Sequence, residues 1–224
     1  MTATGTALSY TTIAAPHRQE LEIRRSRFIT VLERVESDEQ ARALVARLRR
    51  EFPDARHHCS AYLIGPAREI QRANDDGEPS GTAGAPMLEA LMRRETAPGR
   101  ADASDIVAVV VRYFGGVLLG AGGLVRAYSE SVSSALDSAS FLKRERRRLF
   151  TIAVPPAIAG KLENDLRTTG IAVLGSAYDV QLASITAAVA GGQEAVDSFH
   201  GRIAGLTAGQ ALLSQAGEEW VDCA

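Results

Sequence analysis

The chain has 224 residues, with 25 basic and 27 acidic side chains and a formal net charge of -2. This balance gives no overall field that attracts nucleic acid or an anionic membrane, so any such affinity must come from a local surface. The N-terminal residues lack the basic and apolar regions of a secretory signal, and no stretch approaches the ~20 apolar residues of a membrane span. We therefore expect a cytoplasmic protein with no membrane contact, whose two cysteines, Cys59 and Cys223, are free thiols.

The first 53 residues predict an extended segment followed by a helix. Residues 20–35 look extended, and a change in the phase of their apolar alternation predicts a bulge or bend at the basic residues 24–27. Residues 37–40 have capping-box spacing, and apolar residues at helical spacing follow until Phe52-Pro53. The other face of this helix carries four arginines, which we interpret as solvated surface rather than a nucleic-acid stripe: Arg42, Arg47, Arg49 and Arg50.

The next segments predict a hairpin, a helix and a buried strand. Residues 57–64 and 68–73 have the pattern of two short strands, and residues 86–94 that of a short helix. The uninterrupted apolar run 106–111 is typical of a strand covered on both faces. Apolar residues then keep helical spacing from Leu124 to Ala139, so the local order is strand, glycine-rich loop, helix.

Two glycine-rich segments carry the strongest functional signal: 75–84 (DDGEPSGTAG) and 112–128 (RYFGGVLLGAGGLVRAY). Successive glycine amides before a helix are typical of an anion-binding site. The two arginines of this segment, Arg112 and Arg126, would add positive charge to that site. The run is neither a Walker A loop nor a GxGxxG fingerprint. The alternative is that the glycines only permit tight packing. The predicted anion-binding residues of this segment are Arg112, Tyr113, Gly115, Gly116, Gly120, Gly122, Gly123 and Arg126.

In the first glycine-rich segment, the acidic residues Asp75, Asp76 and Glu78 are expected to orient those arginines or to hold a cation. Ser80 and Thr82 are expected to contact an anion. The sequence also allows a hydrolase built from Ser80, His57 and Asp75, or a zinc site at His57 and Cys59. It favours neither of these, and it predicts no catalytic residue, metal or cofactor.

The last third of the chain predicts a separate domain. Residues 143–148 (KRERRR) look like a hinge between an N-terminal domain at 1–142 and a C-terminal domain at 149–224. The apolar pattern after residue 149 predicts the order βαββαβ, which is that of a ferredoxin-like unit. The predicted fold class is α+β with two domains.

These residues resemble the successive signatures of the YigZ/IMPACT family: 26–29 (SRFI), 55–62 (ARHHCSAY), 75–84 and 112–128. The resemblance implies an N-terminal α/β domain similar to domain IV of elongation factor G and to GHMP small-molecule kinases. It also implies a ferredoxin-like C-terminal domain similar to domain V of that factor. Leu118 stands where family members often have a lysine.

The resemblance implies a role linked to translation. Eukaryotic IMPACT members dampen a stress kinase by competing for its ribosome-associated activator, through a chain with an N-terminal extension that is absent here. We expect a regulatory or binding protein, rather than an enzyme, that contacts the ribosome, RNA or a translation-linked protein through its glycine-rich loops. The alternative is a small-molecule or phosphate-ester enzyme with Asp75 or Glu78 as general base.

Overall fold

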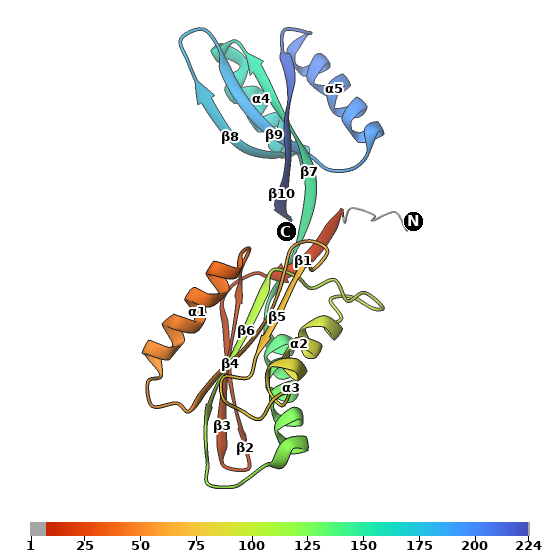
Figure 1. The fold of residues 1–224 in the computed structure, drawn as a ribbon. Coiled ribbons are helices and arrows are strands. Elements are labelled where there is room, and N and C mark those ends of the chain that lie inside the picture. Colours follow the sequence, from red (N-terminus) through yellow and green to blue (C-terminus); the bar gives the residue numbers. More distant parts are fainter. Residues whose placement is uncertain (1–7, 224) are drawn as a thin grey trace. The chain divides into compact units, whose positions relative to one another are not determined.

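The computed structural model of the protein describes residues 8–223. The chain divides into two compact units, with the boundary between Lys143 and Arg144 (Figure 1). Both units combine helices with antiparallel sheets, which confirms the predicted α+β class. No helix among the described residues is long and apolar enough to cross a membrane.

The first unit is built on an antiparallel sheet covered by helices on both faces (Figure 1). Helix α1 (Asp38–Glu51) packs on one face, while α2 (Gly84–Arg93) and α3 (Gly120–Ser138) pack on the other. The short strand β1 (Ser9–Ile13) pairs with β7 (Phe141–Val154), and just beyond the paired strands the Ala14 amide donates to the Ser140 carbonyl. In spatial order the sheet strands are β2 (His17–Ile23), β3 (Ser26–Arg34), β6 (Ile106–Tyr113), β4 (His57–Ile64) and β5 (Ile70–Asn74).

The central strand β6 is buried on both faces, as its apolar run predicts. Ile106, Ala108 and Val110 belong to the core under α2 and α3. Val107, Val109 and Val111 belong to the core under α1. The alternating directions of side chains on a strand therefore let one segment contribute to two cores.

Helix α1 begins as its capping-box spacing predicts. The Ser37 side chain accepts a hydrogen bond from the Gln40 amide at 3.2 Å. The Gln40 side chain reaches back to the Glu36 amide at 2.7 Å, one residue before the usual partner. These bonds satisfy two main-chain donors at the start of the helix.

The bulge or bend predicted at residues 24–27 is wrong, because these residues join two strands in a tight hairpin. Ile23 pairs with Ser26, and the two turn residues, Arg24 and Arg25, have φ angles of 49° and 65°. Two successive positive φ angles are typical of a type I′ turn, which usually carries Asn or Gly. Because arginine is uncommon in that conformation, the sequence gives little sign of the turn.

The second unit has the order βαββαβ and the spatial strand order β10, β7, β9, β8. This is the arrangement of a ferredoxin-like fold, as predicted. Its core joins the strands to the inner faces of both helices through residues such as Phe150, Leu162 and Phe199. The elements are β7 (Phe141–Val154), α4 (Pro156–Thr168), β8 (Ala172–Tyr178), β9 (Ala183–Val189), α5 (Gln193–Thr207) and β10 (Leu212–Cys223).

Residues 143–148, interpreted from sequence as a hinge, lie inside the continuous strand β7. The contact boundary between the units falls at the start of this segment. Its arginines pair with acidic residues: Arg144 with Asp222 at 3.0 Å and Arg146 with Glu218 at 3.5 Å. Strand pairing explains why a charged run can remain extended here.

Candidate functional site

The two glycine-rich segments lie together at one end of the first unit's sheet. Strand β6 ends there, at the first two residues of the second segment, and β4 begins there, so that His57 is opposite Arg112. Both segments line a single pocket of about 390 Å³. From the first segment come Gly77, Glu78 and Pro79, and from the second come Arg112, Phe114, Leu118, Leu119, Gly120, Ala121 and Leu124. Arg56 and His57 complete the lining.

A buried ion pair joins the two segments. The Arg112 guanidinium donates to the Glu78 carboxylate at 2.5 Å, and the two side chains are only 7% and 4% exposed. The Tyr128 hydroxyl on α3 donates to the same carboxylate oxygen at 2.8 Å. The Arg112 guanidinium also lies over the Phe28 ring at 5.4 Å. Arg112 is therefore neutralised and fixed inside the protein, rather than available as a free cation for a ligand.

The hydrogen-bond chain continues from Tyr128 to Cys59. The Cys59 thiol lies 3.3 Å from the Tyr128 hydroxyl and 3.0 Å from the Asp75 carbonyl. Burial raises the pKa of Cys59 to about 12, despite the opposing effect of its hydrogen bond with Tyr128. Burial also raises the pKa of Tyr128. Both groups are therefore neutral at physiological pH, and the thiol has none of the thiolate character needed for nucleophilic attack or zinc binding.

Asp75 has a structural task that the sequence does not reveal. Its carboxylate accepts hydrogen bonds from the amides of Gly81, Ala83 and Gly84 at 2.8, 3.0 and 2.8 Å. It thereby closes the loop and caps the start of α2. Burial acts to raise the pKa of Asp75, but the three amides outweigh it, and the pKa lies below its usual value. The carboxylate is already satisfied and does not contact His57, so the Ser80, His57 and Asp75 triad is not assembled.

Asp76 points away from the pocket toward α1. Its carboxylate accepts from the His58 amide at 2.6 Å and pairs with the Arg49 guanidinium. Its carbonyl lies 2.8 Å from Nδ1 of His57. Because a carbonyl oxygen only accepts, Nδ1 of His57 carries the proton. Nε2 of His57 lies 3.9 Å from the Glu78 carboxylate.

The remaining predicted residues of the first segment have different positions. Ser80 is exposed, and Thr82 is buried with its hydroxyl donating to the Pro79 carbonyl at 2.6 Å. Neither lines the pocket. Within residues 8–223 no cluster of three or more His, Cys, Asp or Glu side chains has the geometry to hold a metal ion.

The glycines of the second segment have three different structural roles: close contact with a neighbouring turn, positive φ angles in the loop, and positions within the first turn of α3. A Cβ on Gly115 would lie 1.8 Å from the Arg25 carbonyl oxygen, so this glycine allows the loop to touch the β2–β3 turn. The Gly115 amide donates to the Ser26 hydroxyl at 3.3 Å. Gly116 and Gly120 have positive φ angles of 83° and 70°. Gly122 and Gly123 lie inside the first turn of α3 and do not line the pocket.

Two further predicted residues lie outside the pocket. Tyr113 packs against the core on the α1 face, with the Arg27 guanidinium 5.5 Å from its ring. Arg126 is exposed on α3. Arg56, His57 and Leu118 also line the pocket, although they are not among the residues predicted from sequence to bind a ligand. Arg56 and His57 belong to the motif 55–62. The position of Arg56 directly before the predicted strand 57–64 was the sequence feature that could have indicated a place at the end of the sheet.

The comparisons with known proteins agree with this architecture. The Impact N-terminal domain model matches residues 24–136, which include β3, most of α3 and both glycine-rich segments. The chain therefore belongs to the IMPACT family. Over 159 residues it is 45% identical to the IMPACT family member YvyE of Bacillus subtilis, covering 71% of this chain and 70% of that protein.

Two other relatives and one solved structure extend the comparison. The chain is 50% identical over 125 residues to the IMPACT family member YigZ of Escherichia coli, covering 55% of this chain and 58% of that protein. It is 48% identical over 135 residues to an IMPACT family member of Haemophilus influenzae, covering 59% of this chain and 62% of that protein. A crystal structure of a hypothetical protein aligns with a TM-score of 0.62 and 36% identity, covering 94% of this chain and 98% of that one.

The buried ion pair gives a first prediction. Glu78→Ala leaves the Arg112 charge buried without its partner, so we expect the free energy of unfolding to fall by about 3–5 kcal/mol. Urea unfolding, followed by the far-UV circular dichroism signal of the backbone, measures the change in the free energy of unfolding. Glu89→Ala removes an exposed i,i+4 pair with Arg93 and should cost less than about 1 kcal/mol. Equal losses in the two variants would contradict the structural role of Glu78.

A second prediction concerns pH. Because the folded-state pKa of Asp75 is depressed, its ionised form stabilises the fold above the unfolded pKa of ~3.9. This contribution is lost as the pH falls through the folded pKa. Asp75→Asn should therefore lower stability by about 1 kcal/mol at neutral pH, with a difference from wild type that shrinks in acid. Unfolding midpoints measured across acidic to neutral pH test this, and a constant difference would contradict it.

Proposed function

We propose that this protein is a translation-associated binding protein that contacts ribosomal RNA with the end of the first unit that carries the pocket. Membership of the IMPACT family supports the link to translation. The single observation that carries the proposal is the meeting of the two glycine-rich segments, about 30 residues apart in sequence, at one pocket. A translation-linked role also implies a cytoplasmic location.

Exposed arginines around this pocket favour an RNA partner. Arg24 and Arg25 form the tip of the β2–β3 turn, which touches Gly115, and Arg56 lines the pocket. All three side chains are exposed, and within residues 8–223 none of them has an ion-pair partner. Because Arg112 is neutralised by Glu78, these three residues provide the positive charge at this end. Unpaired exposed arginines are suited to phosphate contacts.

The loop between β6 and α3 adds apolar and main-chain groups to this surface. Phe114 is 43% exposed and Leu118 is 83% exposed, and both line the pocket. Helix α3 has no side-chain cap and no acidic residue in its first turn, so its first amides remain available as donors. An aromatic ring beside main-chain donors and cations is a combination that binds unpaired nucleotides.

The test is cosedimentation of the full chain with ribosomes at increasing salt. The variant Arg24→Gln, Arg25→Gln, Arg56→Gln removes three charges while keeping long polar side chains. We expect it to weaken binding at least about tenfold and to reduce the salt dependence, since fewer counterions are released. Gln substitution, unlike removal of buried Arg112, leaves the core intact.

The matched control carries the same charge change elsewhere. Arg93→Gln, Arg167→Gln and Arg202→Gln alter exposed arginines on α2, α4 and α5. This control should bind ribosomes like wild type apart from a small general charge effect. Equal weakening in the two triple variants, or salt-independent binding, would contradict the proposal.

One observation favours a second candidate function, which is phosphate-ester hydrolysis. Asp75 and Glu78 are engaged in a helix cap and a buried ion pair, so neither fits the role of general base. His57 does, because its ring lines the pocket and its Nδ1 is held by the Asp76 carbonyl, so that Nε2 is the ring nitrogen available for proton transfer. Turnover of a phosphate ester by the wild type that is lost in His57→Gln would favour this candidate.

A further inference from the structure

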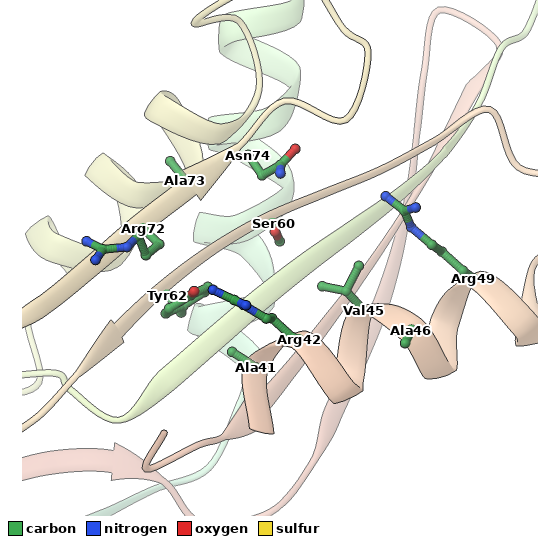
Figure 2. A pocket seen from close by; sticks show the side chains of 10 residues that line it. All are labelled: Ala41, Arg42, Val45, Ala46, Arg49, Ser60, Tyr62, Arg72, Ala73 and Asn74. Atoms are coloured by element: carbon green, nitrogen blue, oxygen red, sulfur yellow. The ribbon is translucent and has the colours of Figure 1, made fainter. Parts of the chain in front are cut away.

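A second pocket, of about 500 Å³, lies on the α1 face of the sheet (Figure 2). Helix α1 packs over β4 and β6 and leaves part of the β4–β5 side uncovered. Ser60 and Tyr62 on β4 are paired with Asn74 and Arg72 on β5, and these side chains form the floor. The wall comes from α1. We call this pocket the α1 groove.

The α1 groove is lined by three guanidinium groups and no carboxylate. Arg42 and Arg49 extend from α1, with Val45 and Ala46 near them on the same helix (Figure 2). Arg72 extends from the edge strand β5 and is exposed. Its guanidinium donates to the neighbouring Gln71 carbonyl at 3.0 Å, and within residues 8–223 it has no ion-pair partner. The groove therefore has excess positive charge.

The other two arginines pair with carboxylates that are not part of the groove lining. Arg42 pairs with Asp38 at 2.6 Å, and Arg49 pairs with Asp76. The Arg42 and Arg49 side chains are 76% and 54% exposed. The Asp38 and Asp76 side chains are 32% and 22% exposed. Ion pairs with an exposed guanidinium are worth about 1 kcal/mol, so a ligand with two negative charges can compete with these carboxylates. Each guanidinium also has five N–H donors, more than one carboxylate can accept.

We propose that the α1 groove binds a phosphorylated small molecule of about nucleotide size. Guanidinium groups suit phosphate oxygens because they form paired, charge-assisted hydrogen bonds. The volume is within the range of small-molecule sites and exceeds what one phosphate fills. Ala41, Val45 and Ala46 give an apolar wall for an organic group, while Ser60 and Asn74 offer polar atoms to orient it.

Occupancy of the α1 groove is coupled to the first pocket through Arg49. Asp76, the partner of Arg49, also accepts from the His58 amide and holds Nδ1 of His57 through its carbonyl. His57 lines the first pocket, whereas Arg49 lines the groove. A phosphate that draws Arg49 away from Asp76 alters the loop that positions His57. The groove proposal itself does not depend on ribosome binding.

Isothermal titration of the full chain tests the site with inorganic phosphate, nucleoside mono- and diphosphates, sugar phosphates, a short RNA and an acidic peptide. We expect at least one phosphorylated small molecule to bind saturably at or below the order of 1 mM and inorganic phosphate to bind at least about tenfold more weakly. Saturable binding only by the RNA or only by the peptide would overturn the proposal, as would no binding at all.

Two substitutions on one helix provide the matched comparison. Ala46→Glu places a carboxylate in the groove, and we expect affinity to fall at least about tenfold. Ala43→Glu adds the same charge to an exposed position of α1 outside the groove and should bind like wild type. Arg72→Gln should also lose affinity, while the Arg24, Arg25 and Arg56 triple variant should keep it. Equal affinity of the Ala46→Glu and Ala43→Glu variants would overturn the assignment to this groove.

A separate measurement tests the coupling. Binding of the phosphorylated ligand should shift the NMR signals of the His57 ring in wild type and leave them unchanged in Arg49→Gln. Unchanged signals in the liganded wild type would overturn the coupling.

Discussion

The buried contact between Arg112 and Glu78 is the interaction on which the candidate site depends. Arg112 comes from the end of the central strand β6, and Glu78 comes from the loop after the edge strand β5. Tyr128 on α3 donates to the same carboxylate. One carboxylate therefore joins a loop, the end of a strand and a helix. Burying two charges is costly unless their geometry is good, so each partner is needed to keep the other in place.

This internal pairing determines which residues can meet a ligand. A free arginine at position 112 would have given a basic pocket centre, but the pair with Glu78 leaves that centre neutral. Positive charge is found instead at the exposed residues Arg24, Arg25 and Arg56. The interior of the site is thus a rigid frame, and its rim carries the charge. Such a division suits a binding surface whose loops keep their shape when a partner arrives.

Asp75 and Asp76 extend the same frame in opposite directions. Asp75 ties the loop to the start of α2, whereas Asp76 ties it to α1 through Arg49. Asp76 therefore contacts a residue of each pocket, because its carboxylate pairs with Arg49 of the α1 groove and its carbonyl lies beside Nδ1 of His57 in the first pocket. Arg49 and His57 both contact Asp76, so displacement of Arg49 acts on His57 through this single residue. This short route gives a physical basis for coupling between the two pockets.

Much of the fold could be predicted from sequence because it depends on local periodicity. The apolar run of β6, the cap at Ser37 and the βαββαβ pattern each act over a few residues. The β2–β3 turn could not be predicted from sequence, because Arg24 and Arg25 adopt positive φ angles that their residue type disfavours.

The site was less predictable because its geometry depends on distant contacts. The sequence placed both glycine-rich segments in one hypothesis, with Arg112 as a ligand-binding cation and Asp75 as a carboxylate that orients the arginines or holds a cation. Their actual partners depend on strand order and on the start of α2, which residue spacing does not encode. Gly115 likewise appeared to be an anion donor, whereas its role is to let the loop contact the carbonyl of Arg25.

Hydrogen exchange of the full chain, free and bound to ribosomes, tests the central claim most directly. If the two glycine-rich segments form one binding surface on a shared frame, amides of residues 77–81 and 114–122 should gain protection together. The amides of α5 should then exchange at the same rates in both states. Protection confined to the second unit, or to only one of the two segments, would contradict the account.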